Sequence, residues 1–169
     1  MAQRSNIVGA MDPNSELMAR LDAVEQRLGT HARAAEPSGR TEPDEGGMER
    51  WEAGQVWAHI GEFVPYWNEQ LRMVVSKYDG TPVPFGRSRT DPGRLKPIEE
   101  NRNVPIAEQM AGTHSSLVAL EAYVRGMSPS DWSAVGMHPA RGAMDARQIV
   151  QFFVVDHLEE HADQLDGLA

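Results

Sequence analysis

Apolar residues recur every three or four positions in four segments of the chain, which is the spacing of one helix face. The segments span residues 14–28, 49–78, 104–125 and the stretch from 145 towards the C-terminus. Asp145 is followed three residues later by Gln148, and this capping-box pattern predicts the start of the last helix. We find neither an internal repeat nor segments with the alternation of paired strands. The pattern therefore predicts an all-α fold, and four helices of this length favour a four-helix bundle.

Two long connections separate the predicted helices. Residues 29–47 are rich in Ala, Pro, Gly and charged residues without periodicity, and we expect them to be mobile. Residues 79–97 contain Gly and Pro too densely for regular structure, and a connection of this length in a bundle often covers a site. A flexible N-terminus is expected over residues 1–12. The whole chain, residues 1–169, is predicted to form a single domain with long connecting loops.

Composition and charge narrow the classes of function. The net charge of -9 and the pI near 5.1 disfavour nucleic acid as a partner, because that affinity comes mainly from Lys and Arg. No run is long and apolar enough to span a membrane, and the N-terminus lacks the apolar core of a secretory signal. We therefore expect a cytoplasmic protein without membrane contact. Since the chain has no cysteine, any thiol chemistry must use a thiol brought from outside.

Two histidines stand four residues apart near the end of the chain, in the stretch DHLEEHADQL. Residues at this spacing project from the same side of a helix, with Cβ atoms roughly 5–6 Å apart. His157 and His161 could therefore hold one ion through bonds of about 2.0–2.1 Å. The pair continues an apolar stripe that includes Val150, Phe153 and Val154. We expect both imidazoles to face the interior of the bundle.

A third histidine with an inward position lies in the second predicted helix. His59 stands between Val56 and Phe63 on the same side of that helix. Three neutral imidazoles from two helices can hold a divalent ion and leave one coordination position open, as in a catalytic rather than a structural site. On spacing alone, a set of hydrogen-bonded core histidines without a metal is the alternative interpretation.

The runs WEAGQVWAHIGEF and GMHPARGAMDARQIVQFFVVDHLEEHADQL resemble the DinB-like superfamily. This superfamily includes metal-dependent thiol S-transferases that use bacillithiol or mycothiol, and the mycothiol-dependent maleylpyruvate isomerases. The family pattern has a Trp before V-x-x-H on the second helix, then an H-P-x-x-G turn leading into a helix that ends D-H-x-x-x-H-x-x-Q-L. Trp51, Val56 and His59 match the first part. The second part is matched by His138, Pro139, Gly142, Asp156, His157, His161, Gln164 and Leu165.

The resemblance implies an up-down-down-up four-helix bundle, commonly a homodimer. It implies that zinc or nickel is bound at one end of the bundle by His59, His157 and His161. It also implies small-molecule partners, namely a low-molecular-weight thiol and an electrophilic substrate. The chain stops soon after the metal helix, without the additional C-terminal domain of the isomerases, so we expect simple thiol transfer rather than isomerisation.

The predicted function is a divalent-metal-dependent thiol S-transferase that activates a mycothiol- or bacillithiol-like thiol at the three histidines. A coordinating ion deprotonates a thiol whose own pKa is about 8.5. A metal-dependent hydrolase is an alternative, because the same ion can activate water. A non-catalytic dimeric metal-binding or stress-response bundle, and a helical interaction protein without metal, are further alternatives. The sequence does not identify the metal, the thiol or the substrate, and it does not assign a catalytic side chain.

Four further residues are candidates for the surroundings of the metal. Asp156 and Glu160 could accept the free N–H of an imidazole, and the alternative for both is a solvated helix flank. Gln164, one turn beyond His161, could line the pocket or simply pack. His138 is expected near the bundle end, either as a turn residue or as a ligand.

Aromatic and basic residues mark two other regions. Trp51, Trp57 and Trp67 are expected to pack in the core or at an interface. Positive charge gathers in the connection after the second helix, at Arg87, Arg89, Arg94 and Lys96. If this loop folds over the metal, these side chains could receive the carboxylates of a thiol cofactor or an acidic substrate. A solvated, mobile loop is the alternative.

Overall fold

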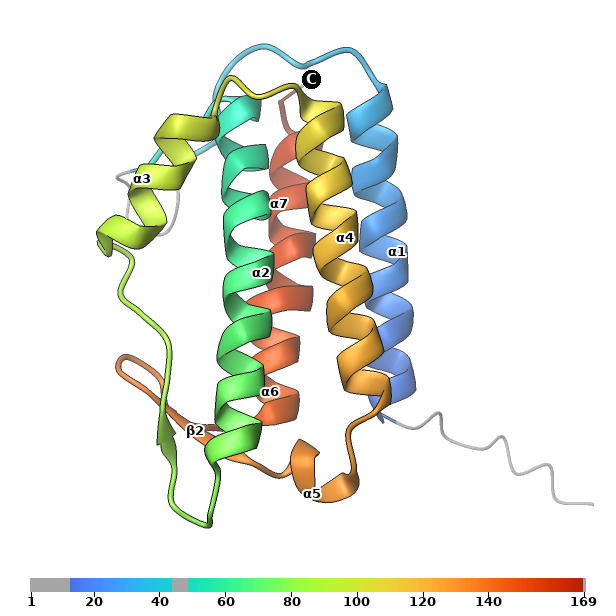
Figure 1. Ribbon diagram of the computed structural model, residues 1–169. Helices are drawn as coiled ribbons and strands as arrows, with labels where there is room; N and C mark the ends of the chain where they lie inside the picture. Colours follow the sequence, from blue (N-terminus) through green and yellow to red (C-terminus); the bar gives the residue numbers. More distant parts are fainter. Residues whose placement is uncertain (1–12, 44–48, 169) are drawn as a thin grey trace, which may run out of the picture.

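The computed structural model describes residues 13–43 and 49–168, and the N-terminus expected to be flexible, residues 1–12, lies outside them. Long helices dominate the described residues (Figure 1). They are α1 (Pro13–Arg33), α2 (Ala53–Lys77), α4 (Ile106–Arg125) and a composite last helix of α6 (Ala146–Val150), the π-helical turn η1 (Gln151–Val155) and α7 (Asp156–Asp166). In Figure 1, α1 rises, α2 and α4 descend, and the composite helix rises again. The predicted up-down-down-up order is thus confirmed.

The core forms from the helix faces that the sequence pattern indicates. Leu21 and Leu28 of α1 and Ile60 and Phe63 of α2 are each 0% exposed. Burying such a side chain contributes roughly 1.5–3 kcal/mol relative to leaving it in water. The same core cluster includes Leu117, Leu120, Ile149, Val154, Leu158 and Leu165. The apolar spacing therefore predicts the inward faces of all four long helices.

The last helix begins at the predicted capping box. The Asp145 side chain accepts a hydrogen bond from the Gln148 N–H at 2.7 Å, and the Gln148 side chain accepts one from the Asp145 N–H at 2.9 Å. Two backbone donors at the helix start are satisfied in this way. The start of the composite helix is therefore fixed at its first turn. From there the helix runs through the bundle and places His157 and His161 in its interior.

Two connections are more helical than expected. α1 continues to Arg33, beyond the predicted end at residue 28. The positive charge of Arg33 in its last turn suits the C-terminal end of a helix dipole. A further helix, α3 (Pro92–Asn101), begins inside the segment 79–97, which is predicted to be irregular, and extends beyond it. The Asp91 side chain caps it by accepting the Gly93 N–H at 2.7 Å. Ile98 is the residue that α3 buries, so its sequence lacks the apolar residues at every third or fourth position that predict a helix.

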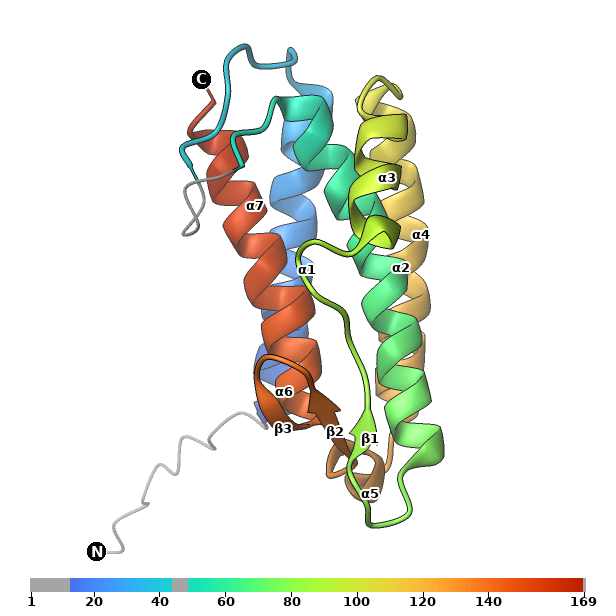
Figure 2. The same ribbon diagram turned by 90° about the vertical axis from the view of Figure 1, so that its left-hand side faces the viewer.

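The expectation that the chain lacks paired strands is wrong. A small sheet in the order β1-β2-β3 is formed by β1 (Val83–Pro84), β2 (Val135–His138) and β3 (Gly142–Asp145). β1 pairs with β2 in parallel and β2 with β3 antiparallel. These strands are too short for a period of two to show in the sequence. The predicted helical bundle thus carries a small sheet in addition, at the lower end of the bundle beside α6 (Figure 2).

A short helix, α5 (Pro129–Trp132), links α4 to the sheet. In the described residues, no helix combines the length and the apolar character that a membrane crossing requires. The connection from β1 to α3 runs across the side of the molecule between α2 and α7 (Figure 2). This placement matters for the site, because α2 and α7 carry the histidines.

Candidate metal centre

Three histidines from two helices meet inside the bundle. His59 comes from α2, and His157 and His161 come from α7. The Nε2 atom of His157 lies 3.1 Å from the Nε2 atoms of both His59 and His161. His59 and His161 are each 3% exposed, and His157 is partly exposed. Among the described residues, these three form the group of metal-ligand side chains whose atoms could share one ion.

The spacing of the three nitrogens fits a divalent ion. Nitrogens held tetrahedrally at about 2.0–2.1 Å from one ion lie about 3.3 Å apart. The 3.1 Å separations are close to this value, and one ligand atom from each ring lies within 4.8 Å of the others. The residues present therefore fit a three-histidine metal site with room for further ligands.

Each imidazole has a side-chain oxygen near its Nδ1, three residues further along its helix. The Nδ1-to-oxygen distances are 3.5 Å for His59–Glu62, 3.3 Å for His157–Glu160 and 2.9 Å for His161–Gln164. The His59–Glu62 approach is not a hydrogen bond, because neither atom has a hydrogen-bond partner among the described residues. A nearby oxygen of this kind favours the tautomer with its proton on Nδ1. The three Nε2 lone pairs then converge on one point, which is unfavourable unless a cation or a proton lies between them.

Burial keeps two of the rings neutral. Loss of water, together with the neighbouring imidazoles His161 and His157, lowers the pKa of His59 well below 6.5. The same two causes, burial and the nearby His157, lower the pKa of His161 to about 3. Neutral imidazole is the form that binds metals, so no proton has to be removed from these rings at neutral pH.

Glu62 lies between the three histidines and the connection after β1. Its side chain is 8% exposed and forms an ion pair with Arg87, whose guanidinium also lies 3.8 Å from the centre of the Tyr66 ring. Burial raises the pKa of Glu62, and the hydrogen bond from Arg87 opposes this shift. Sequence reasoning missed Glu62. The signal was present, because His59 and Glu62 have the same i, i+3 spacing as His157 and Glu160.

Two of the predicted neighbours have other partners. The Asp156 carboxylate accepts a hydrogen bond from Arg20 of α1 at 2.6 Å. His138 is the last residue of β2, is 6% exposed, and accepts the Ala140 N–H on its Nδ1 at 3.2 Å. It lies outside the group of converging ligand atoms. Glu160 and Gln164, by contrast, are placed beside the metal-ligand candidates as expected.

A cavity of about 700 Å³ opens beside the three histidines. One wall is aromatic, with Trp51, Phe63, Trp67, Phe152 and Phe153 among the lining residues. Of the three tryptophans expected to pack, Trp57 and Trp67 belong to the buried core, at 1% and 8% exposure. Trp67 also lines this cavity, together with the partly buried Trp51. The aromatic wall limits access of water to the ring nitrogens, which strengthens electrostatic interactions there.

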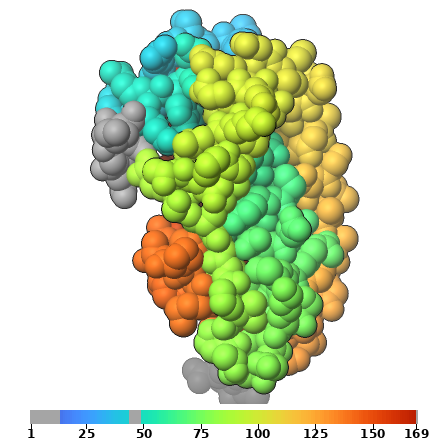
Figure 3. All heavy atoms as spheres, turned by 60° about the vertical axis from the view of Figure 1, so that its left-hand side comes forward, coloured from blue at the N-terminus to red at the C-terminus, as the bar shows by residue number. Residues whose placement is uncertain are grey.

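Four arginines line the same cavity. Arg87, Arg89 and Arg94 come from the connection after β1 and the start of α3, and Arg141 comes from the β2–β3 hairpin. Figure 3 shows this hairpin, in orange, beside the connection, in yellow-green. Residues of this long connection line the cavity next to the histidines, so the connection lies over the candidate site. Lys96 lies on the solvent side instead, with 74% of its side chain exposed.

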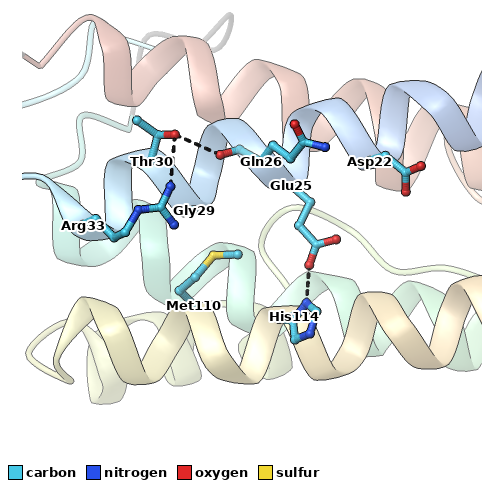
Figure 4. Close-up of a pocket in the computed structure, with 8 residues that line it drawn as sticks. All are labelled: Asp22, Glu25, Gln26, Gly29, Thr30, Arg33, Met110 and His114. Atoms are coloured by element: carbon cyan, nitrogen blue, oxygen red, sulfur yellow. Dashed lines mark hydrogen bonds and ion pairs between the residues drawn. The ribbon is translucent and has the colours of Figure 1, made fainter.

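A second hollow lies between α1 and α4 and is chemically simpler (Figure 4). It has a volume of about 490 Å³ and is open to solvent. Its polar groups pair with one another, as His114 does with Glu25 at 2.6 Å. It has no converging group of ligand atoms among the described residues. The cavity at the three histidines is therefore the candidate functional site.

Comparisons with known proteins identify the fold. No protein-family model matches the sequence, and no curated protein matches it either. YfiT from Bacillus subtilis, described as "a probable metal-dependent hydrolase with an unusual four-helix bundle topology", has a similar structure with a TM-score of 0.74. The match has 14% sequence identity and covers 99% of this chain and 91% of YfiT.

The mycothiol-dependent maleylpyruvate isomerase is also similar, with a TM-score of 0.69 and 14% identity. The match covers 91% of this chain and 61% of the isomerase, so this chain spans less than two thirds of that protein. A mutant of the same isomerase matches with a TM-score of 0.68. At this identity the likeness establishes the fold, and the chain thus has a four-helix-bundle fold like that of YfiT, with three histidines grouped as a candidate metal site.

Proposed function

We propose that this protein is a divalent-metal-dependent thiol S-transferase that uses a low-molecular-weight thiol. The observation that supports it is the convergence of three Nε2 atoms, 3.1 Å apart in successive pairs, beside a cavity of about 700 Å³. When bound, a divalent ion would supply the Lewis acidity that makes a thiol ionise at neutral pH, although its own pKa is about 8.5. The thiol must come from outside, because the chain has no cysteine.

The protein's own residues would prepare this site for an ion. His59, His157 and His161 would present their Nε2 atoms to the ion, with the side-chain oxygens three residues further along beside their Nδ1 atoms. These oxygens fix ring orientation and raise the basicity of the ligating nitrogen. Zinc and nickel both suit imidazole ligands, and we propose one of them as the resident ion.

The cavity has room for a small molecule beside the three histidines. Its volume of about 700 Å³ is within the range of small-molecule sites and can hold a thiol cofactor. The fold likeness to a mycothiol-dependent isomerase also supports a thiol. The likeness to YfiT supports a second candidate, a metal-dependent hydrolase in which water takes the place of the thiol.

Metal content tests the site first. We expect about one divalent ion per chain when the untagged protein is loaded with zinc and analysed by elemental mass spectrometry. His157→Ala should lose the ion, because it removes the ring that lies 3.1 Å from both of the others. His114→Ala should keep it, since His114 lies in the other hollow. Equal metal content in wild type and His157→Ala would contradict the site.

Activity then separates the two candidates. We expect the zinc- or nickel-loaded protein to accelerate the reaction of a small thiol with chlorodinitrobenzene, and His157→Ala to lose this acceleration. Consumption of an ester such as nitrophenyl acetate without any thiol would instead support the hydrolase. A loaded protein that accelerates neither reaction would favour a non-catalytic metal-binding bundle.

A further inference from the structure

Arg141 borders the cavity at the end formed by the sheet. It stands in the β2–β3 loop directly before Gly142, whose φ of 76° places it in the left-handed region that favours glycine. The guanidinium carbon of Arg141 lies 3.5 Å from the centre of the Phe152 ring. Within residues 13–43 and 49–168, the contacts found for this guanidinium are with aromatic rings and none is with a carboxylate. Its N–H donors are therefore available to a bound molecule.

The other arginines of the cavity already face acidic side chains. Arg87 forms an ion pair with Glu62. Arg94 donates to both carboxylate oxygens of Glu49, at 3.2 and 3.1 Å. Arg89 also lies 3.6 Å from Glu49. Glu62 of α2 and Glu49, before α2, thus largely neutralise the positive charge of these three arginines. This leaves Arg141 as the arginine best placed to receive an anion.

His138 places a second donor at the same end of the cavity. Its Nδ1 accepts the Ala140 N–H at 3.2 Å, so the proton of the neutral ring must be on Nε2. The Nε2 atom is buried and has no hydrogen-bond partner among the described residues. The ring is packed against Phe153, with 5.0 Å between the ring centres, and it lines the cavity. A buried donor without a partner is unfavourable, and an oxygen of a bound ligand would satisfy it.

We propose that His138 and Arg141 form an anion subsite, which binds a carboxylate of the molecule that fills the cavity. Both side chains lie against the Phe153 ring, the guanidinium carbon of Arg141 being 6.0 Å from its centre. One guanidinium and one neutral N–H match the single charge and the two oxygens of a carboxylate. The proposal rests on the proposed function, because the same molecule would reach the three histidines with its reactive end.

The cavity wall between the hairpin and the three histidines indicates the chemistry of the middle part of the ligand. Trp67 and Phe153 are stacked with 3.9 Å between their ring centres, and Phe63 lies 4.6 Å from the His157 ring centre. These rings offer an apolar surface from the subsite towards the histidines. The substrate class is therefore an amphipathic acid: a carboxylate at the hairpin, an apolar middle, and a metal-binding or reactive group at the histidines.

Mercapto acids test this arrangement directly. The zinc-loaded protein is titrated by calorimetry with straight-chain mercapto acids, from mercaptopropionate to mercaptohexanoate, and with the mercapto alcohols of the same lengths. We expect at least one acid to bind about ten- to a hundredfold more tightly than its alcohol, the range of one charge-assisted hydrogen-bond pair. Acids that bind no more tightly than alcohols at every length would overturn the proposal.

Matched variants locate the effect. Arg141→Gln should abolish the preference for acids, and Arg125→Gln should keep it, since Arg125 loses the same charge on α4 outside the cavity. Equal loss in both variants would mean general charge attraction and would overturn the subsite. His138→Asn keeps an acceptor for the Ala140 N–H but lacks the far donor, whereas His138→Gln keeps a donor of similar reach. We expect His138→Asn to weaken acid binding and His138→Gln to preserve it. If His138 only stabilises the turn through the Ala140 N–H, His138→Asn should preserve acid binding and His138→Gln should weaken it.

The outcome also separates this proposal from the proposed function. If neither thiol series binds in a zinc-dependent way, the thiol transferase fails, and the subsite is decided by hexanoate against hexanamide on the same protein. A preference for hexanoate that Arg141→Gln removes would support the subsite by itself. Equal binding of the two would overturn it.

Discussion

At the scale of single residues, the candidate site consists of one unit used three times. A histidine presents Nε2 to the centre and turns Nδ1 to an oxygen at i+3, supplied by Glu62, Glu160 or Gln164. Helical geometry makes this unit local, because residues three apart are neighbours on one face. The tertiary fold then has to bring only two helix faces together to complete the site.

Glu62 gives the sharpest test of the outer oxygens. Glu62→Gln removes the carboxylate charge that lies 3.5 Å from His59 Nδ1, and it removes the ion pair with Arg87. We expect zinc affinity, measured by competition with a chromophoric chelator, to fall about ten- to a hundredfold. Glu69→Gln, at an exposed position on the same helix, should leave the affinity unchanged. Equal affinities for the two variants would show that the Glu62 carboxylate does not support the site.

The low pKa values of His59 and His161 predict how the metal-free protein responds to acid. Unfolded histidines ionise near pH 6.5, whereas burial lowers the pKa of His161 to about 3 in the folded chain. Between these values the unfolded state binds more protons, so stability is fully present above about pH 6.5 and declines as the pH falls. We expect the free energy of unfolding in urea to fall from pH 7 to 5, by up to about 1.4 kcal/mol per pH unit for each such histidine.

Two variants check the origin of this slope. His161→Gln should flatten it, because the residue that resists protonation is gone. His114→Gln should leave it unchanged, since His114 is exposed and lies outside the cluster. The same slope in all three proteins would mean that other groups cause the acid sensitivity.

At the scale of elements, the approach of α2 to the end of α3 depends on one glycine. A Cβ at Gly54 would lie 2.1 Å from the carbonyl oxygen of Arg102, a backbone atom that cannot move alone. Gly61, two turns further along α2, has open space where a Cβ would be. The two positions therefore respond to the same substitution in opposite ways.

Gly54→Ala should destabilise the protein by about 1–3 kcal/mol, the cost of overpacking. Gly61→Ala should stabilise it by about 0.5–1 kcal/mol, because alanine restricts the unfolded chain and favours the helix. Urea unfolding of the two variants measures both effects. A neutral or stabilising Gly54→Ala would contradict the close contact between α2 and α3.

The π-helical turn in the last helix serves the cavity. In η1 (Gln151–Val155) the backbone takes more residues per turn than an α-helix, and such turns often occur at functional sites. Phe152 and Phe153, consecutive in sequence, both line the cavity together with His157 of the next turn. A regular α-helix separates neighbouring side chains by about 100°. The wider turn brings both rings to the cavity side.

At the scale of the whole molecule, α1 is attached to α7 by burial and by ion pairs. Arg27 contacts Asp163 and Asp166, whose side chains are 72% and 52% exposed. Leu28, the next residue, is 0% exposed. Exposed ion pairs contribute about 0–1 kcal/mol, whereas truncating a buried leucine costs about 2–5 kcal/mol. Burial should therefore dominate the stability of the bundle.

Neighbouring variants test this ranking. We expect Leu28→Ala to lower the free energy of unfolding by about 2–5 kcal/mol. Arg27→Ala should lower it by no more than about 1 kcal/mol, and this small effect should shrink further at high salt. Chemical denaturation at low and high ionic strength measures both. A larger effect for Arg27→Ala would mean that the ion pairs hold α1 in place.

Local periodicity determined much of this protein. The spacing of apolar residues predicts the inward faces of the four long helices, and the same periodicity selects His59, His157 and His161. Both follow from a property that one helix has by itself, the projection of residues three and four apart from one side. Even Glu62, which was missed, is visible in the sequence as an i+3 neighbour of His59.

Only the tertiary structure decided the small sheet, α3 and the cavity. β1 pairs with β2 across about fifty residues of chain, and strands this short have no stable register without that partner. α3 buries only Ile98 and depends on its packing against α2. The cavity combines side chains from the connections, α2, the hairpin and the last helix, so residues such as Trp51 and Arg141 gain their roles there. The sequence by itself determines what each helix presents, because that is local, whereas the tertiary structure determines which presented groups meet, because that depends on long-range packing.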